Sequence, residues 1–209
     1  MPSEGPRKDH LERKLAAILA ADIAGYSALM EANEEATVRD LKAHQAVILP
    51  MIPKHGGHLI DTAGDGILAE FPSVVNAVEC ALAVQKTMAE RNTNVDPERR
   101  MEFRIGVNLG DVIHDEVRVY GDGVNIAARL EAIAEPGGIC LSGEAFAHVQ
   151  RRLQLTGLDL GDKQLKNIAQ PIRVYRVVAP QVPSVPARPP LSLPGQAIHR
   201  SPPLHEPQR

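Results

Sequence analysis

Residues 58–71 read HLIDTAGDGILAEF, two short apolar runs on either side of the bend Ala63-Gly64-Asp65. Apolar runs of this length around a glycine-containing bend predict a β-hairpin. The stretch also holds two aspartates four residues apart, Asp61 and Asp65. Because a carboxylate is costly to bury without a partner, both are candidates for a site, and they need not do the same job.

Strand and helix patterns alternate on both sides of this hairpin. A buried strand from Leu15 to Ala21, ending at Asp22, precedes it, and one helix is expected from Ser27 to about Val47, closed before Pro50 and Pro53. Ser73 is a candidate N-cap for a helix after the hairpin. Further strands are expected at 101–107 with an extension to 113, at 139–141, at 153–160 and at 172–178, and further helices at 124–134 and 143–151. This order predicts an α+β fold, a mixed and mostly antiparallel sheet with helices packed on one face.

Composition excludes several classes of protein. The chain has 209 residues, 44% of them hydrophobic, and a net charge of -3, so no basic field points to nucleic acid or to a membrane surface. The polar start is not a signal peptide, and no early apolar run is long enough to span a bilayer, so we expect a cytoplasmic protein. Cys80 and Cys140 are expected to be buried, reduced thiols.

The chain divides into three expected parts. Nine of the 17 prolines fall in residues 180–209, where large apolar residues are few, so this tail is expected to be disordered or a linker. Residues 1–12 are expected to be a disordered N-terminus, and residues 13–179 to form one folded domain.

Asp22 and Asp65 are the strongest candidates for chemistry. If the hairpin pairs beside the first strand, the two carboxylates converge at one end of the sheet, where they suit a hard divalent cation such as Mg²⁺. The backbone that follows Asp22 leads into a helix start, whose free N–H groups suit phosphate. From the spacing alone, an N-cap role for Asp22 and a turn role for Asp65 are the favoured interpretation.

Weaker signals lie elsewhere. Asn125 and Arg129 share one helix face and could orient a ribose and neutralise a phosphoryl charge, although a solvated surface contact is the favoured interpretation of the pair taken alone. Lys166 is a lone cation near a strand, with loop solvation as its simplest interpretation. His55 and His58 have no third ligand nearby in sequence, which makes a weak metal signal.

Four segments taken together are far more specific. They are LAAILAADIAGYSALM (15–30), DTAGDGILAEFPS (61–73), FRIGVNLGDVI (103–113) and YGDGVNIAARLEAIAEPGGICLS (120–142). In this order they resemble the catalytic domains of class III adenylate and guanylate cyclases of bacterial type. The resemblance runs from about Arg13 to Val178 and includes LKNIAQPIRVYRV (165–177).

The resemblance implies a ferredoxin-like βαββαβ core and a head-to-tail homodimer with active sites at the interface. The metal-binding aspartates of the family match Asp22 and Asp65, with the backbone carbonyl of Ile23 as a further ligand, for two Mg²⁺ or Mn²⁺ ions per site. The backbone of Ala24, Gly25, Tyr26 and Ser27 would hold the phosphates. Asn125 and Arg129, from the partner chain, match the residues that act in the transition state. Lys166 is the nearest candidate for the triphosphate-binding lysine.

The implied reaction converts ATP or GTP to its 3′,5′-cyclic monophosphate and pyrophosphate, in cyclic-nucleotide signalling. The two base-selecting positions match Asp61 and Arg118, where adenylate cyclases of this type usually carry Lys and one of Asp, Thr or Ser. The choice between ATP and GTP therefore stays open. An alternative is a cyclase-like pseudoenzyme that binds nucleotide or dimerises without turnover. A diguanylate cyclase is a further alternative, but its Gly-Gly-Asp/Glu-Glu-Phe signature is absent.

Overall fold

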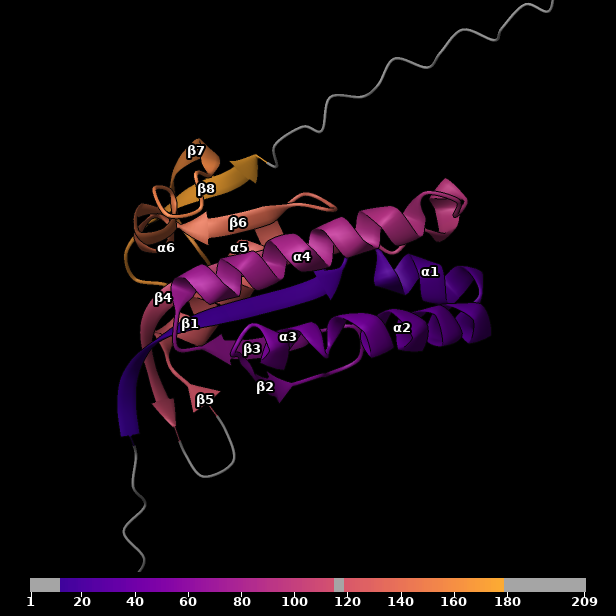
Figure 1. The fold of residues 1–209 in the computed structure, drawn as a ribbon, viewed down its shortest axis with the longest axis horizontal. Helices are drawn as coiled ribbons and strands as arrows, with labels where there is room; N and C mark the ends of the chain where they lie inside the picture. Colours follow the sequence, from indigo (N-terminus) through magenta and orange to yellow (C-terminus); the bar gives the residue numbers. More distant parts are fainter. Residues whose placement is uncertain (1–11, 115–118, 179–209) are drawn as a thin grey trace, which may run out of the picture.

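The computed structural model of the chain describes residues 12–114 and 119–178, shown in Figure 1. The expectations for the N-terminal segment, for Arg118 and for the proline-rich tail lie outside these residues. Among the described helices, none is long and apolar enough to cross a membrane.

One sheet organises the described chain. Its strands are β1 (Glu12–Ile23), β2 (His58–Asp61), β3 (Ile67–Phe71), β4 (Phe103–His114), β5 (Val119–Tyr120), β6 (Ile139–Ser142), β7 (Thr156–Lys163) and β8 (Ile172–Val178). They lie in the order β2-β3-β1-β4-β6-β8-β7, with β5 paired to β4. Only the β4–β6 pairing is parallel among the described pairs. The expected mixed, mostly antiparallel sheet of an α+β fold is therefore confirmed, and β2-β3-β1-β4 is the strand order of a ferredoxin-like core.

Helices cover both faces of this sheet, so the expectation that they lie on one face is wrong (Figure 1). The helices are α1 (Tyr26–Ala32), α2 (Glu34–Ile48), α3 (Met51–Lys54), α4 (Val74–Asn92), α5 (Asp122–Ile133) and α6 (Gly143–Val149), with a 3-10 turn at Pro97–Arg99. Ala17, Leu19 and Ala21 of β1 belong to a core cluster to which every one of these α-helices except α5 contributes. Ala16, Ile18 and Ala20 point the other way and pack against α5. Because alternate strand residues face opposite sides, a strand apolar on both faces requires cover on both.

Gly106 explains how closely α5 approaches the sheet. A Cβ at this position of β4 would lie 2.2 Å from the Ala127 carbonyl oxygen and 2.3 Å from the Glu131 backbone nitrogen. Only glycine fits where a helix backbone rests this close on a strand. The glycine therefore fixes where Glu131 meets the sheet.

Local sequence explains where the expected elements end differently. The single helix expected over 27–47 is broken at Asn33, whose backbone is extended and whose side chain accepts a hydrogen bond from the Ala36 N–H, as an N-cap does. Pro53 lies inside the short helix α3 rather than beyond a helix end. Ser73 caps α4 as expected. The strand expected from Leu153 begins only at Thr156, after Gln154 with a positive φ of 49°.

Candidate active site

Asp22 and Asp65 lie side by side at the end of β1. The antiparallel pairing of β1 with β3, which sets Ala21 opposite Ile67, carries the tip of the β2–β3 hairpin to this point. The Asp65 carboxylate accepts a hydrogen bond of 3.0 Å from the Ile23 N–H. Gly64, with a φ of +64°, forms the bend, and its carbonyl oxygen accepts from the Gln45 side chain of α2 at 3.2 Å. Asp22 is no N-cap, because Gly25 holds that position without a side-chain hydrogen bond.

Arg104 of β4 binds the Asp22 carboxylate with two hydrogen bonds. The strand register sets the two residues opposite each other. Nε donates to Oδ1 at 2.9 Å and Nη2 to Oδ2 at 2.5 Å. Both side chains are 27% exposed. Hydrogen bonding to Asp22, against a smaller effect of burial, raises the pKa of Arg104, so this guanidinium is a permanent cation in the site.

Glu131 of α5 completes the group. Its Oε1 lies 3.2 Å from Nη2 of Arg104, and the side chain is 13% exposed. This oxygen is buried and has no hydrogen-bond partner of good geometry among the described residues. Burial first, and then contact with the Asp22 carboxylate, raises the pKa of Glu131 to about 8, while the charge of Arg104 acts in the opposite direction. The site is therefore rich in carboxyl groups and holds one guanidinium.

The backbone after Asp22 offers donors for an anion, though not all four of the residues expected to do so. The Ala24 N–H already donates to the Glu102 carbonyl oxygen at 2.9 Å. Tyr26 and Ser27 open the helix α1, where first-turn N–H groups lack helical partners. Available donors therefore concentrate from Gly25 onward.

The other predicted residues lie away from this group. Asp61 is exposed at the end of the edge strand β2, whereas Asp65 is half-buried, so the two aspartates of the hairpin occupy different environments. Asn125 is exposed on α5, and Arg129 is half-buried with a buried Nε that has no acceptor in the described part of the chain. Lys166 is exposed in the loop between β7 and β8.

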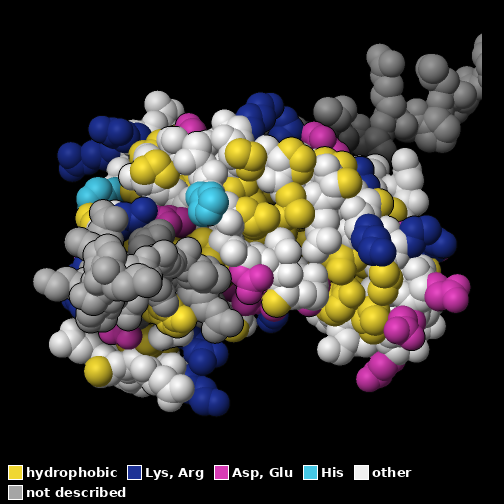
Figure 2. All heavy atoms as spheres, turned by 90° about the horizontal axis from the view of Figure 1, so that it is seen from below, with side chains coloured by type: hydrophobic (Ala, Val, Ile, Leu, Met, Phe, Trp, Pro, Cys, Tyr) yellow, Lys and Arg dark blue, Asp and Glu magenta, His cyan; other side chains and the backbone are white. Residues whose placement is uncertain are grey.

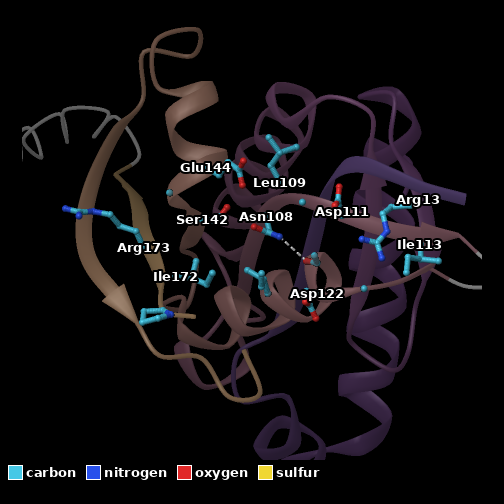
Figure 3. Close-up of a pocket in the computed structure, with 16 residues that line it drawn as sticks. Arg13, Asn108, Leu109, Asp111, Ile113, Asp122, Ser142, Glu144, Ile172 and Arg173 are labelled. Carbon is cyan, nitrogen blue, oxygen red and sulfur yellow. Dashed lines mark hydrogen bonds between the residues drawn. The ribbon is translucent and has the colours of Figure 1, made fainter. Parts of the chain in front are cut away.

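A cavity of about 730 Å³ lies at a different place (Figure 3). Its lining comes from β4, the start of α5, and the segments around Ser142 and Ile172. In Figure 3 Asn108 points toward the start of α5, where its amide donates to the Gly123 carbonyl oxygen at 3.2 Å. Arg13, which also lines the cavity, is nine residues before Asp22 on β1. Asp22 and Asp65 are not among the residues that line this cavity, although the helix that carries Asn125 and Arg129 borders it.

Two of the residues that meet at Asp22 escaped the sequence analysis. Arg104 and Glu131 both lie inside the four segments quoted above, but no motif or spacing singled them out. A signal for Arg104 exists in retrospect, because this residue alternates with the buried Phe103, Ile105 and Val107. The residues that follow Arg104 on its own strand face, Gly106, Asn108 and Gly110, carry no charge. For Glu131 no comparable signal exists, because a glutamate near a helix end is ordinary.

The donor set suits a divalent cation only when a ligand supplies further oxygens. Within residues 12–114 and 119–178, no three His, Cys, Asp or Glu side chains are grouped as a metal-binding set. His55 instead places Nδ1 2.8 Å from the Met51 carbonyl oxygen. Two neighbouring carboxylates are nevertheless what Mg²⁺ takes from proteins when phosphates and water complete its shell.

Comparison with known proteins agrees with this architecture. Residues 10–178 match the family described as the adenylate and guanylate cyclase catalytic domain. The chain is 42% identical over 194 residues to "Putative adenylate cyclase 3" of Rhizobium meliloti (strain 1021), covering 90% of this chain but 33% of that protein. The chain thus spans about a third of the length of this relative.

Two solved structures are similar throughout the domain. An adenylate/guanylate cyclase/hydrolase from Silicibacter pomeroyi has 44% sequence identity and a TM-score of 0.77, over 81% of this chain and 99% of that one. The adenylyl cyclase CyaB from P. aeruginosa has 26% identity and a TM-score of 0.71, over 81% and 96%. The chain therefore belongs to the adenylate and guanylate cyclase catalytic domain family.

Proposed function

We propose that this domain cyclises a purine nucleoside triphosphate to the 3′,5′-cyclic monophosphate with release of pyrophosphate. One observation carries the proposal: the carboxylates of Asp22 and Asp65 adjoin at the end of β1, beside a backbone run that can bind phosphate. Family membership supports the same reaction.

Asp22 and Asp65, with the Ile23 carbonyl oxygen, would hold two Mg²⁺ or Mn²⁺ ions. Bound there, the ions would lower the pKa of the ribose 3′-hydroxyl and neutralise phosphate charge. The hydrogen bond from the Ile23 N–H holds Asp65 in place, and so its carboxylate needs little reorganisation. Arg104 adds a fixed positive charge that can bind triphosphate oxygens. The N–H groups from Gly25 to Ser27 would orient the same phosphates.

We assign the remaining groups to a partner chain. Asn125 would orient the ribose, and Arg129 would stabilise charge at the α-phosphate. The buried Arg129 Nε, which has no acceptor among the residues that the structure describes, supports this role, because a desolvated guanidinium donor needs an anion. Figure 2 shows hydrophobic side chains gathered in groups on one face of the domain, and exposed apolar patches of this kind can mark a contact surface. Lys166 remains a candidate for the triphosphate.

The base stays open between adenine and guanine. An Asp61 carboxylate suits the N1–H and N2–H donors of guanine and cannot donate to adenine N1. Asp61→Lys should therefore shift the ratio of GTP to ATP turnover toward ATP. An unchanged ratio would show that Asp61 does not read the base.

The test of the function is direct. Purified protein with Mn²⁺ is given ATP or GTP, and cyclic nucleotide and pyrophosphate are measured together. Equal amounts of both products, lost in Asp22→Asn, support the cyclase. Nucleotide binding without either product would support the alternative, a pseudoenzyme that binds or dimerises without turnover.

A further inference from the structure

Arg104 and a metal ion compete for the same carboxylate. The guanidinium uses both oxygens of Asp22. A divalent cation at Asp22 would meet this positive charge within a few ångströms, where like charges repel strongly in a half-buried setting. Metal binding therefore requires Arg104 to move or to share the carboxylate.

A second acceptor lies within reach of the same nitrogen. Glu131 Oε1 is 3.2 Å from Arg104 Nη2 and lacks a hydrogen-bond partner of good geometry among the described residues. A small rotation of the guanidinium would exchange the Asp22 oxygen for this one. Glu131 is held at this distance because Gly106 lets α5 rest on β4.

We propose that Glu131 is a positioning residue that takes Arg104 from Asp22 when the metal binds. The inference rests on the proposed metal role of Asp22. Glu131 acts through Arg104 and is not itself a ligand. The exchange keeps the guanidinium inside the site, where it remains available to phosphate.

A double-mutant cycle tests this coupling without requiring turnover. Binding of Mn²⁺ alone to the full chain is measured by electron paramagnetic resonance of the free ion, in wild type, Glu131→Gln, Arg104→Met and the double variant. Asp22→Asn identifies the binding that belongs to the site. Glu135→Gln is the matched control, because Glu135 follows α5 but pairs with Arg176 instead.

Glu131→Gln should weaken Mn²⁺ binding about fivefold, because Arg104 then has no second carboxyl group within reach to take the place of Asp22. Arg104→Met should strengthen it, and in that background Glu131→Gln should change it less than about twofold. Glu131→Asp keeps the carboxyl group on a shorter side chain, so its Mn²⁺ affinity should be intermediate. It provides a second measurement if Glu131→Gln folds poorly. In turnover, Glu131→Gln should raise the Mn²⁺ concentration for half-maximal rate and leave kcat at saturating Mn²⁺ nearly unchanged.

Equal losses of Mn²⁺ affinity in both backgrounds would mean that Glu131 acts on the metal directly, and the inference would fall. No loss in the wild-type background, or no Asp22-dependent Mn²⁺ binding, would overturn it as well. The proposed function fails separately, if wild type binds Mn²⁺ at Asp22 but forms no cyclic nucleotide.

Discussion

Two groups of charged side chains lie on opposite faces of the sheet, and they differ in how completely they are paired. The Asp22 cluster comprises Asp22, Asp65, Arg104 and Glu131. It has three carboxyl groups for one guanidinium, and one of its buried oxygens has no hydrogen-bond partner among the described residues. A half-buried group of carboxyl groups that outnumber their cationic partners favours binding of a positively charged ligand.

The His44 cluster comprises Asp40, His44, Arg91 and Arg99, on and beside α2 and α4. Arg91 Nε donates to His44 Nδ1 at 2.9 Å, and Arg99 pairs with Asp40 at 2.7 Å. Each of these charged groups has a partner on another element. The contrast indicates that a cluster of charged side chains is a functional candidate when its members are incompletely paired, and a structural one when every member has a partner.

The largest expected effect comes from removing one aspartate from each cluster and comparing the losses of activity. Asp22→Ala should lower cyclase activity by at least ~100-fold, because it removes a metal carboxylate. Asp40→Ala, which breaks the Arg99 pair of the His44 cluster, should leave activity within about twofold and cost less than about 1 kcal/mol of stability. Cyclic nucleotide formation and thermal unfolding are measured on both. A comparable activity loss in Asp40→Ala would erase the distinction between the clusters.

Subunit mixing tests whether the Asp22 cluster needs a second chain. Asp22→Ala and Asn125→Ala should each be inactive alone. Mixed, they should recover roughly a quarter of wild-type activity, because half of the dimers would then carry one intact site of two. A native mass spectrum verifies exchange between subunits. Exchange without recovery would mean that each site is built within one chain.

Most of the fold was accessible from the sequence. Hairpin, caps and apolar periodicity are local signals, so β2, β3, α4 and β8 fell where expected. The sequence did not predict that Asn33 separates α1 from α2, because an asparagine between two helical patterns can be either an interior residue of one helix or the N-cap of a second. Cover on both faces was missed although the unbroken apolar run from Leu15 to Ala21 places apolar residues on both faces of β1 and therefore requires it. How closely α5 approaches Gly106 is a tertiary property that no local signal predicts.

The candidate site was accessible only in part. Asp22 and Asp65 stand out because carboxylates interrupt apolar runs. Arg104 and Glu131 come from a strand and a helix well beyond the hairpin in sequence. Only the strand register and the packing of α5 bring them to Asp22. No local spacing in the sequence therefore predicts these contacts.

Gly106→Ala should damage the Asp22 cluster through packing alone. A Cβ there collides with the α5 backbone, which cannot give way as a side chain end could. We expect a loss of about 3 kcal/mol in the free energy of unfolding. Gly161→Ala, at a φ of +75° with open space around it, is the control and should cost only about 1 kcal/mol. Chemical denaturation measures both. Equal losses would show that α5 adjusts and that Gly106 does not fix Glu131.

The smallest effect belongs to the His44 cluster and concerns pH. Burial, and then the charge of Arg91, lowers the pKa of His44 below its ordinary value of 6.5. As pH falls below 6.5, the unfolded chain binds a proton at this residue that the folded chain resists, so stability falls with pH until the folded-state pKa is passed. The slope from this residue is at most about 1.4 kcal/mol per pH unit.

His44→Gln should remove that slope, because the glutamine oxygen can still accept from Arg91 but does not titrate in this range. Unfolding by denaturant between pH 5 and 8 measures it. Above pH 7 the free energies of unfolding of the variant and of wild type should differ by less than about 1 kcal/mol. Below pH 6 the two values should converge or cross, because only wild type loses stability through His44. His148→Gln, at an exposed position on α6, is the control and should keep the wild-type slope. A wild-type slope in His44→Gln would show that other groups carry the acid sensitivity. Protonation of His44 would then contribute nothing to the pH dependence of stability.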